Sequence, residues 1–306
     1  MSARRTSLRG SVLEAMRLQS VPPEMEQALT KEFVHLHILS ALSDTGLLEH
    51  VVFQGGTAIR LCHGGDRYSE DLDFVCGARG AYLDAVDFDR VVGVGLQATR
   101  NTLARQFGLE PDAIGLKAPD DPAAIRGVGV HVAAWQLVVP LEATERSPKS
   151  RIKVEFANVP SYDNGPRIVR SGVRTAQVQP VYLRVETPRE ILADKAVALT
   201  ARAVLKHRDV WDVWFLQDAL KAGLDVDMVS RKFGDYGTPD PEARALARID
   251  ELAGPKASVD FLAEMRRFLP SRDVEQMERF GMHHAMLEAS AGLLREFVAA
   301  PRPGPA

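Results

Sequence analysis

The chain has 306 residues, 45% of them hydrophobic and 26% charged, which suits a soluble globular protein of one large domain or two smaller ones. Its formal net charge of −3 excludes a protein that attracts nucleic acid through an overall positive charge, so any nucleic-acid surface has to be local. No hydrophobic run approaches the roughly 18 residues of a membrane-spanning helix, and the two cysteines match no zinc or redox spacing. We therefore expect a cytoplasmic protein without membrane contact.

The basic start of the chain, MSARRTSLRG, lacks the hydrophobic region of a secretory signal, and we expect disorder there and in the tail PRPGPA. Residues 108–129 have a loop-like composition, and the stretch to about 187 is irregular and contains prolines. From Pro188 onward nearly every segment has a helical pattern. The sequence thus predicts a mixed α/β domain over 1–187 and a helical domain over 188–306. Within the first domain we expect helices at 23–47, 57–62 and 87–107 and strands at 51–54, 71–76, 130–139 and 150–158.

The stretch GGTAIRLCHGGDRYSEDLDF contains an acidic pair, Asp71 and Asp73, in a predicted strand. Side chains alternate along a strand, so both carboxylates lie on one face, roughly 6–7 Å apart, while Leu72 and Phe74 face the core. Their repulsion is costly unless a cation lies between them. Mg²⁺ prefers such oxygen ligands, and two such ions can hold the attacking and leaving oxygens of a phosphoryl transfer.

Gly55 and Gly56 lie between a predicted strand and a predicted helix. Without side chains there, backbone N–H groups can approach a triphosphate, and Ser69 is placed to add a hydroxyl. Either an acidic pair or a glycine pair alone is common on solvated surfaces. A strand, a glycine pair, a helix and a second strand bearing S-x-D-x-D form a much rarer combination, which favours a nucleotide site.

A two-metal site needs a third carboxylate on a neighbouring strand, and RIKVEF supplies Glu155. Glu155 shares a face with Lys153, so the same pattern also fits a solvated sheet face with a Lys–Glu pair.

A charged stripe is predicted in ADKAVALTARAVLKHRDVWD. If one helix continues through it, a rotation of 100° per residue places Lys195, Arg202, Lys206 and Asp209 on one face. Such a stripe is usually a solvated helix face, and Asp209 also fits the N-cap of the following helix. A basic stripe is equally what would neutralise phosphate. Residues 151–210 contain eleven Lys and Arg against six Asp and Glu, an excess opposite in sign to the whole chain.

The segments FQGGTAIRL, RYSEDLDF, IKVEF and EILADKAVALTARAVLKHRDVWDVWFL resemble the AbiEii/AbiGii nucleotidyltransferase toxins, within the DNA polymerase β-like nucleotidyltransferase superfamily. The resemblance covers roughly residues 50–76 and 150–220. It implies a mixed α/β nucleotidyltransferase domain followed by a helical domain. It further implies Mg²⁺ or Mn²⁺ and an NTP as reactants, and the toxin of a type IV toxin–antitoxin or abortive-infection system. A DNA-binding antitoxin as partner and a tRNA 3′ end as acceptor are also implied.

The resemblance also implies roles for individual residues. Asp71 and Asp73 would bind metal, with Glu155 as an auxiliary acid. Lys195 would contact the nucleotide, and either Asp209 or Asp212 would be the acidic residue of the last motif. The expected nucleotide-binding residues are Gly55, Gly56, Thr57, Ser69, Arg202 and Lys206.

Three other interpretations remain open. DLDFV also fits the D-x-D start of haloacid-dehalogenase-type phosphatases, although the preceding DRYSE is polar where a buried strand is expected. The chain could instead be a non-catalytic module that binds a partner protein, for which a degraded acidic pair would be expected. Finally, the acceptor of a nucleotidyltransferase could be a protein or a small molecule, because surfaces outside these motifs choose it.

Overall fold

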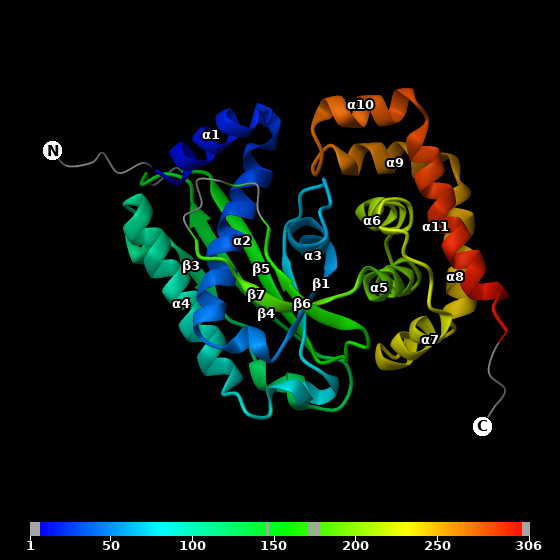
Figure 1. Ribbon diagram of the computed structural model, residues 1–306, viewed down its shortest axis with the longest axis horizontal. Helices are drawn as coiled ribbons and strands as arrows, with labels where there is room; N and C mark the ends of the chain where they lie inside the picture. Colours follow the sequence, from blue (N-terminus) through cyan, green and yellow to red (C-terminus); the bar gives the residue numbers. More distant parts are fainter. Residues whose placement is uncertain (1–6, 145–146, 171–172, 174–177, 302–306) are drawn as a thin grey trace. The chain divides into compact units, whose positions relative to one another are not determined.

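The computed structural model describes residues 7–144, 147–170, 173 and 178–301 (Figure 1). The chain forms two compact units, Met1–Val185 and Glu186–Ala306, each described by itself below. The division into two domains near residue 187 stays a prediction. The disorder expected at the ends concerns residues 1–6 and 302–306, which lie outside the described residues. Leu8 to Gly10, however, form the first turn of a helix that Ser7 caps, which corrects the expectation for them.

The first unit contains a mixed seven-stranded sheet in the order β3-β4-β5-β2-β1-β7-β6. β1 runs antiparallel to β2 and parallel to β7, and β2 runs parallel to β5. The strands are β1 (Val52–Gln54), β2 (Leu72–Val75), β3 (Gly115–Lys117), β4 (Val132–Pro140), β5 (Lys149–Ala157), β6 (Asn164–Ile168) and β7 (Tyr182–Glu186). The helices are α1 (Leu8–Gln19), α2 (Glu26–Asp44), α3 (Gly55–Cys62) and α4 (Phe88–Phe107).

An aromatic row fixes the register of the central strands. Phe53 on β1 is opposite Phe74 on β2, which is opposite Phe156 on β5. All three are buried, with ring centroids 5.1 and 5.0 Å apart. Phe88, at the start of α4, packs on Phe156 and on Trp135 of β4, so α4 covers this face. Because side chains alternate, the residues beside this row point to the opposite face of the sheet.

Helices α2 and α4 pack against each other, and α2 also contacts β5 (Figure 1). The helices and strands expected in the first unit are all present, with ends shifted by a few residues. Three strands were missed. β3 lies in the supposed loop 108–129, and β6 and β7 lie in the supposed irregular stretch. β3 and β6 are three- and five-residue strands at the two edges of the sheet, so neither has a pattern long enough to reveal it.

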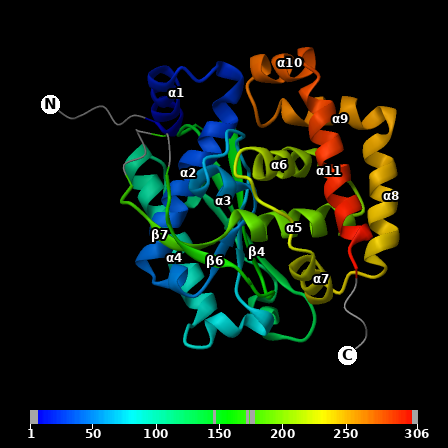
Figure 2. The ribbon, with the colours of Figure 1, turned by 45° about the vertical axis from the view of Figure 1, so that its right-hand side comes forward.

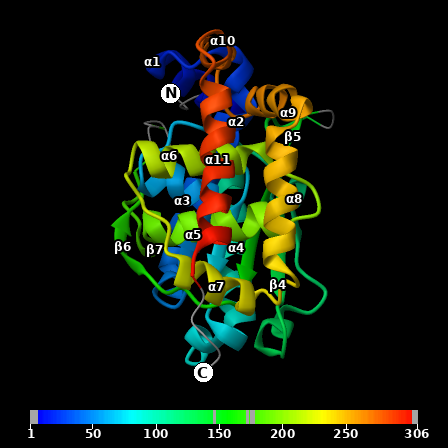
Figure 3. The ribbon, with the colours of Figure 1, turned by 90° about the vertical axis from the view of Figure 1, so that its right-hand side faces the viewer.

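The second unit is helical, as the sequence predicts. α5 and α6 lie side by side, and α11 packs along α8 (Figures 2 and 3). The helices are α5 (Pro188–Ala201), α6 (His207–Asp218), α7 (Val226–Asp235), α8 (Pro241–Ala253), α9 (Pro255–Met265), α10 (Ser271–Arg279) and α11 (Met282–Ala299). No helix among the described residues is long and hydrophobic enough to cross a bilayer.

Two buried histidines of α2 make the first unit sensitive to acid. His35 and His37 are 1% and 5% exposed, and burial lowers the pKa of each to about 4. A backbone contact to the Glu70 carbonyl offsets part of the effect of burial on His35. Between pH 6.5 and pH 4 the unfolded chain takes up protons that the folded chain does not. Stability is therefore complete above about pH 6.5 and decreases as the pH falls toward 4.

We expect His37→Leu to remove the part of the acid-induced loss of stability that His37 causes. His37 packs between Phe33 and Phe107, so a hydrophobic side chain suits its site. Denaturant unfolding at pH 7 and pH 4.5 should show a loss of unfolding free energy that is roughly 2–3 kcal/mol smaller in the variant than in the parent. Carboxylates titrate in both proteins and cancel in this comparison. Equal losses would show that His37 is not held neutral by burial.

Candidate active site at the junction of β1 and α3

The junction between β1 and α3 brings glycine backbone against an acidic side chain. Gly55 has φ +78°, a left-handed conformation that favours glycine, and it begins α3 directly after Gln54. A Cβ added to Gly55 would lie 2.8 Å from Oδ2 of Asp73. The sequence predicted a glycine pair between the strand and the helix. In the structure the two glycines instead form the first turn of the helix itself. The bare Cα of Gly55 leaves room for the Asp73 carboxylate.

Gly56 makes room for a buried arginine that the sequence analysis did not assign. A Cβ on Gly56 would lie 2.3 Å from Nη2 of Arg67 and 3.1 Å from Oγ of Ser69. Arg67 is 1% exposed, and its Nη1 donates to the Tyr68 carbonyl at 2.9 Å. Its guanidinium thus lies at the first turn of α3, together with the expected Ser69 hydroxyl. The signal that could have found it is an arginine two residues before Ser69, between the glycines and the acidic pair.

Gly56→Ala should disrupt this site. The added methyl group can be accommodated only if the buried Arg67 side chain moves, and small-to-large changes in packed interiors cost about 1–3 kcal/mol. We expect lower unfolding free energy and weaker NTP binding, measured by denaturation and by calorimetric titration. Gly93→Ala is the matched control, because a Cβ on Gly93 in α4 meets nothing within 4 Å. It should be neutral or slightly stabilising. Equal unfolding free energy and equal NTP affinity in the two variants would show that the close contact at Gly56 affects neither stability nor binding.

The acidic residues gather at one position of the sheet. Asp73 on β2 is directly opposite Glu155 on β5, and Gln54 on β1 is opposite Asp73 from the other side. All three lie on the face away from the aromatic row. Asp71 immediately precedes β2, and both aspartates are half-buried. Glu155 also pairs with Lys153, Nζ to Oε1, at 3.4 Å. Glu155 thus has both neighbours that the sequence offered, the carboxylate of Asp73 and the ammonium of Lys153.

These residues suit a hard divalent cation. The donors are carboxylates, the type of ligand that Mg²⁺ and Mn²⁺ prefer, and Asp73 and Glu155 are cross-strand neighbours whose like charges repel. The bare Cα of Gly55 keeps the space at the Asp73 carboxylate clear of a side chain. Asp71, Asp73 and Glu155 do not form a closed three-carboxylate cage. Such a cage is typical of a dedicated protein site, whereas Mg²⁺ in nucleotide sites is also held by substrate phosphates.

A polar network holds the segment that leads into β2. Arg60 of α3 donates to the carbonyl of Asp66 at 2.8 Å and stacks on the ring of Tyr68 at 4.3 Å. Glu32 of α2, 3% exposed, holds Arg60 through a 2.7 Å ion pair. The Thr57 hydroxyl donates to the backbone carbonyl of Asp71. The Thr57 side chain therefore fixes the acidic segment, so a role in nucleotide binding falls to its backbone N–H.

In the second unit, Lys195 is the centre of a buried ion cluster. It is 7% exposed, and its Nζ lies 2.7 Å from Oδ1 of Asp209 and 2.7 Å from Oδ2 of Asp212. Arg202 forms a further ion pair with Asp209. Burial opposes ionisation of Asp209, but attraction by Lys195 and Arg202 outweighs it and lowers the pKa of Asp209 to about 2. The cluster joins α5, the segment after it and α6, and both aspartates named by the resemblance belong to it.

The continuous helical stripe expected here is wrong. α5 ends at Ala201, and Arg202 has extended backbone, so α6 begins anew at His207. Lys195, Arg202 and Asp209 meet because the chain folds back between α5 and α6. Asp209 lies in the first turn of α6 and not at its N-cap, which is Lys206. Lys206 is exposed, and no ion pair joins it to the cluster among the described residues. The functional roles of these residues stay predictions.

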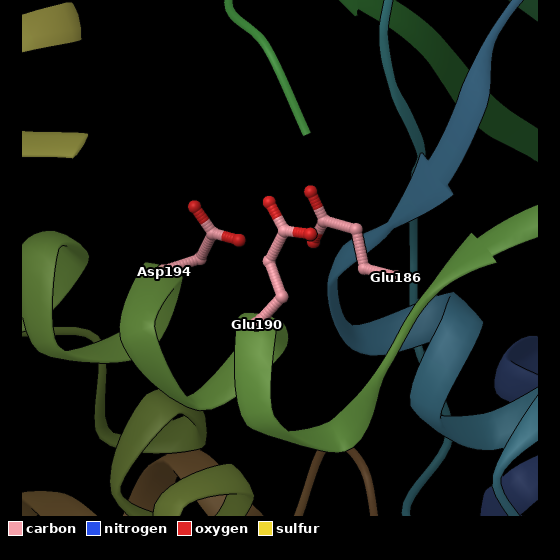
Figure 4. Close-up of side chains that lie close together, drawn as sticks. All are labelled: Glu186, Glu190 and Asp194. Carbon is pink, nitrogen blue, oxygen red and sulfur yellow. The ribbon is translucent and has the colours of Figure 1, made fainter. Parts of the chain in front are cut away.

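A second buried cluster, absent from the sequence analysis, lies between α5 and α7. Among the described residues, only Glu186, Glu190 and Asp194 bring three carboxylate oxygens within 4.8 Å of one another (Figure 4). The ammonium of Lys232 contacts Glu190 at 2.8 Å and Asp194 at 2.9 Å. Burial and the neighbouring Asp194 raise the pKa of Glu186 well above its usual range. A side-chain cation thus already lies among these carboxyl groups, so we assign the cluster to the packing of the helices.

Comparisons with known proteins identify the class as nucleotidyltransferase. The family model of the AbiEii nucleotidyl transferase toxin, of type IV toxin–antitoxin systems, matches residues 37–280. The chain therefore belongs to the AbiEii nucleotidyltransferase toxin family, and the expected resemblance and fold class are confirmed. Membership of this family implies a nucleoside triphosphate as substrate and a cognate antitoxin. A search of the curated proteins finds no match.

One solved structure supports the fold at low sequence identity, and a second is reported for its similarity alone. The nucleotidyltransferase toxin MenT4 from Mycobacterium tuberculosis is similar with a TM-score of 0.50 and 16% identity, over 94% of this chain and 90% of that chain. JHP933 from Helicobacter pylori is similar with a TM-score of 0.49 and 18% identity, over 89% of this chain and 94% of that chain.

Proposed function

We propose that this toxin transfers a nucleoside monophosphate from an NTP to the 3′ end of a tRNA in a reaction that depends on Mg²⁺ or Mn²⁺. The observation that carries the proposal is the placement of Asp73 beside Glu155 on one sheet face, with the first turn of α3 against the Asp73 carboxylate. Asp71 and Asp73 would hold the metal, with Glu155 as an auxiliary acid. The bound metal would offset phosphate charge and stabilise the attacking and leaving oxygens.

The residues of the chain bind and orient the reactants. Backbone N–H groups at the start of α3, from Gly55 to Thr57, receive no capping side chain from Gln54 and are suited to donate hydrogen bonds to a phosphate oxygen. The Ser69 hydroxyl and the Arg67 guanidinium lie at the same turn. The acceptor hydroxyl oxygen forms a bond to the α-phosphorus as the bond to the bridging oxygen breaks. Pyrophosphate leaves with that electron pair, and the hydroxyl proton passes to water.

Lys195 and the aspartates of its cluster would complete the function in the second unit, with Lys195 contacting the nucleotide. Arg202, 43% exposed at its side chain, and the exposed Lys206 would add positive charge. The excess of positive charge at residues 151–210 supports an acceptor that is bound through a limited number of phosphates. The antitoxin would be a DNA-binding regulator, and the biological setting would be abortive infection.

The deciding experiment follows the α-phosphate. The purified chain is incubated with each NTP labelled at the α-phosphate, together with tRNA, total protein and small hydroxyl compounds. Label on tRNA 3′ ends, dependent on Mg²⁺ or Mn²⁺, would support the proposal. Label only on protein or on a small molecule would end the tRNA assignment and leave the transferase standing. No label on any acceptor, together with no growth defect on expression, would overturn the proposed reaction and favour a partner-binding module.

A further inference from the structure

One half of β5 presents a row of cations on the face that carries the candidate active site. Lys149, Arg151 and Lys153 are exposed, while the alternating Ser150 and Ile152 are buried. Successive cations on this face are about 6.7 Å apart, because a strand rises about 3.3–3.4 Å per residue. Three cations in this arrangement repel one another, so an anion along the row would be stabilising.

The strands on one side of β5, β4 and then β3, do not neutralise this row. Lys149, Arg151 and Lys153 lie opposite Pro140, Val138 and Gln136 of β4, none of which is acidic. Gln136 in turn lies opposite Lys117 of β3, which is exposed on the same face. Lys153 pairs with Glu155, and no described residue forms an ion pair with Lys149, Arg151 or Lys117. We call Lys117, Lys149, Arg151 and Lys153 the basic strip.

The basic strip and the acidic residues form two ends of one surface. Along β5 the same face continues from Lys153 to Glu155, and from Glu155 across to Asp73 on β2. A reactive end placed at the acidic residues would therefore leave the rest of an elongated acceptor lying along β5. The strip contains no aromatic side chain on which a base could stack. Recognition here rests on charge, which suits a phosphate backbone and not a particular base sequence.

We propose that the basic strip binds the sugar–phosphate backbone of a single-stranded RNA end, close to its reactive hydroxyl. This inference rests on the proposed nucleotidyl transfer and assigns its acceptor surface. Arg151 can hold a phosphate with two parallel hydrogen bonds, and the lysines act as point charges. Binding through three or four phosphates is salt-dependent and tolerant of sequence.

The test measures RNA binding directly, without transfer. Anisotropy of a fluorescein-labelled single-stranded oligoribonucleotide is followed against salt for the parent and for the triple variant Lys117→Gln/Lys149→Gln/Arg151→Gln. Loss of three phosphate contacts should reduce the slope of log affinity against log salt by about 2, at roughly 0.7 per contact, and should leave NTP affinity unchanged. The control Arg17→Gln/Arg105→Gln/Lys256→Gln removes the same charge from exposed positions on α1, α4 and α9 and should bind RNA like the parent.

Three results would overturn the inference: an unchanged slope in the strip variant, an equal change in the control, or equal competition by poly-glutamate of matched charge. Lys117 lies on β3, an edge strand, where a lysine also prevents edge-to-edge pairing, and that role alone predicts aggregation of the strip variant with unchanged RNA binding. Asp73→Asn separates the two proposals, because it should bind the RNA normally and fail to label it. Strip-dependent binding by a parent that transfers nothing would contradict the proposed function and support the binding surface.

Discussion

Asp73→Asn should lower nucleotide transfer at least ~100-fold, the scale of one lost electrostatic contact at a reacting group. The amide keeps the shape of the side chain against Gly55 but removes the charge that would hold a metal ion. The substitution also removes the like-charge repulsion between Asp73 and Glu155, worth roughly 0.2–1 kcal/mol. Transfer is measured with α-labelled NTP, and stability is measured by thermal unfolding. Expression of the variant should no longer slow bacterial growth.

Asp120→Asn is the matched control, since it removes one exposed carboxylate from the same unit, at a position outside the strands. It should leave transfer and growth inhibition intact. Asp71→Asn should resemble Asp73→Asn, because both carboxylates are assigned to the metal. Near-normal transfer by Asp73→Asn would remove this residue from the proposed site, whatever the control does.

Lys195→Met should lower the unfolding free energy by about 3–5 kcal/mol, because it leaves Asp209 and Asp212 buried without their shared cation. A lysine on a solvated helix face could be replaced without such a loss, but Lys195 is buried. At acid pH the difference in unfolding free energy between the parent and Lys195→Met should become smaller. The pKa of Asp209 is lowered to about 2, so the contribution of its ion pairs is complete above the ordinary pKa near 3.8 and is lost as the pH falls toward 2.

A second variant separates stability from function. Lys195→Met/Asp209→Asn/Asp212→Asn removes the buried charges together and should recover much of the lost stability, as neutral replacements of buried ion clusters often do. If Lys195 contacts the nucleotide, this variant should fold and still show a raised KM for NTP. Recovery of both stability and normal transfer would reduce the cluster to a structural role.

The sequence predicted the centre of the sheet better than its edges. β1, α3 and β2 follow one another with clear alternation and a glycine pair, and the buried faces of Phe53 and Phe74 make that pattern unambiguous. β3 and β6 are short edge strands, in which pairing with a neighbour, and not a local pattern, creates the strand. β7 has only five residues, which alternate between exposed and buried only briefly.

For the candidate site, the sequence predicted chemical types more readily than neighbours. It named Glu155 as a third carboxylate, and the structure places it opposite Asp73, a relation that depends on strand order. Arg67 was missed because its place at the first turn of α3 depends on the path of residues 63–71 and on the missing Cβ of Gly56. Lys195 was grouped with Asp209 on the assumption of one continuous helix, but α5 ends at Ala201. The two residues do form an ion pair, because the chain folds back between α5 and α6.

The aromatic row has a consequence for how this toxin acquires activity. Phe53, Phe74 and Phe156 are in register across three strands, and each directly precedes or follows an acidic or polar residue of the opposite face. A slip of β2 by one residue would turn Asp73 into the hydrophobic interior and Phe74 out to water. The three phenylalanines that position the acidic residues therefore also make pairing in the wrong register unfavourable. A newly made chain should be harmless until the sheet has closed in register, so growth arrest should follow folding and not synthesis.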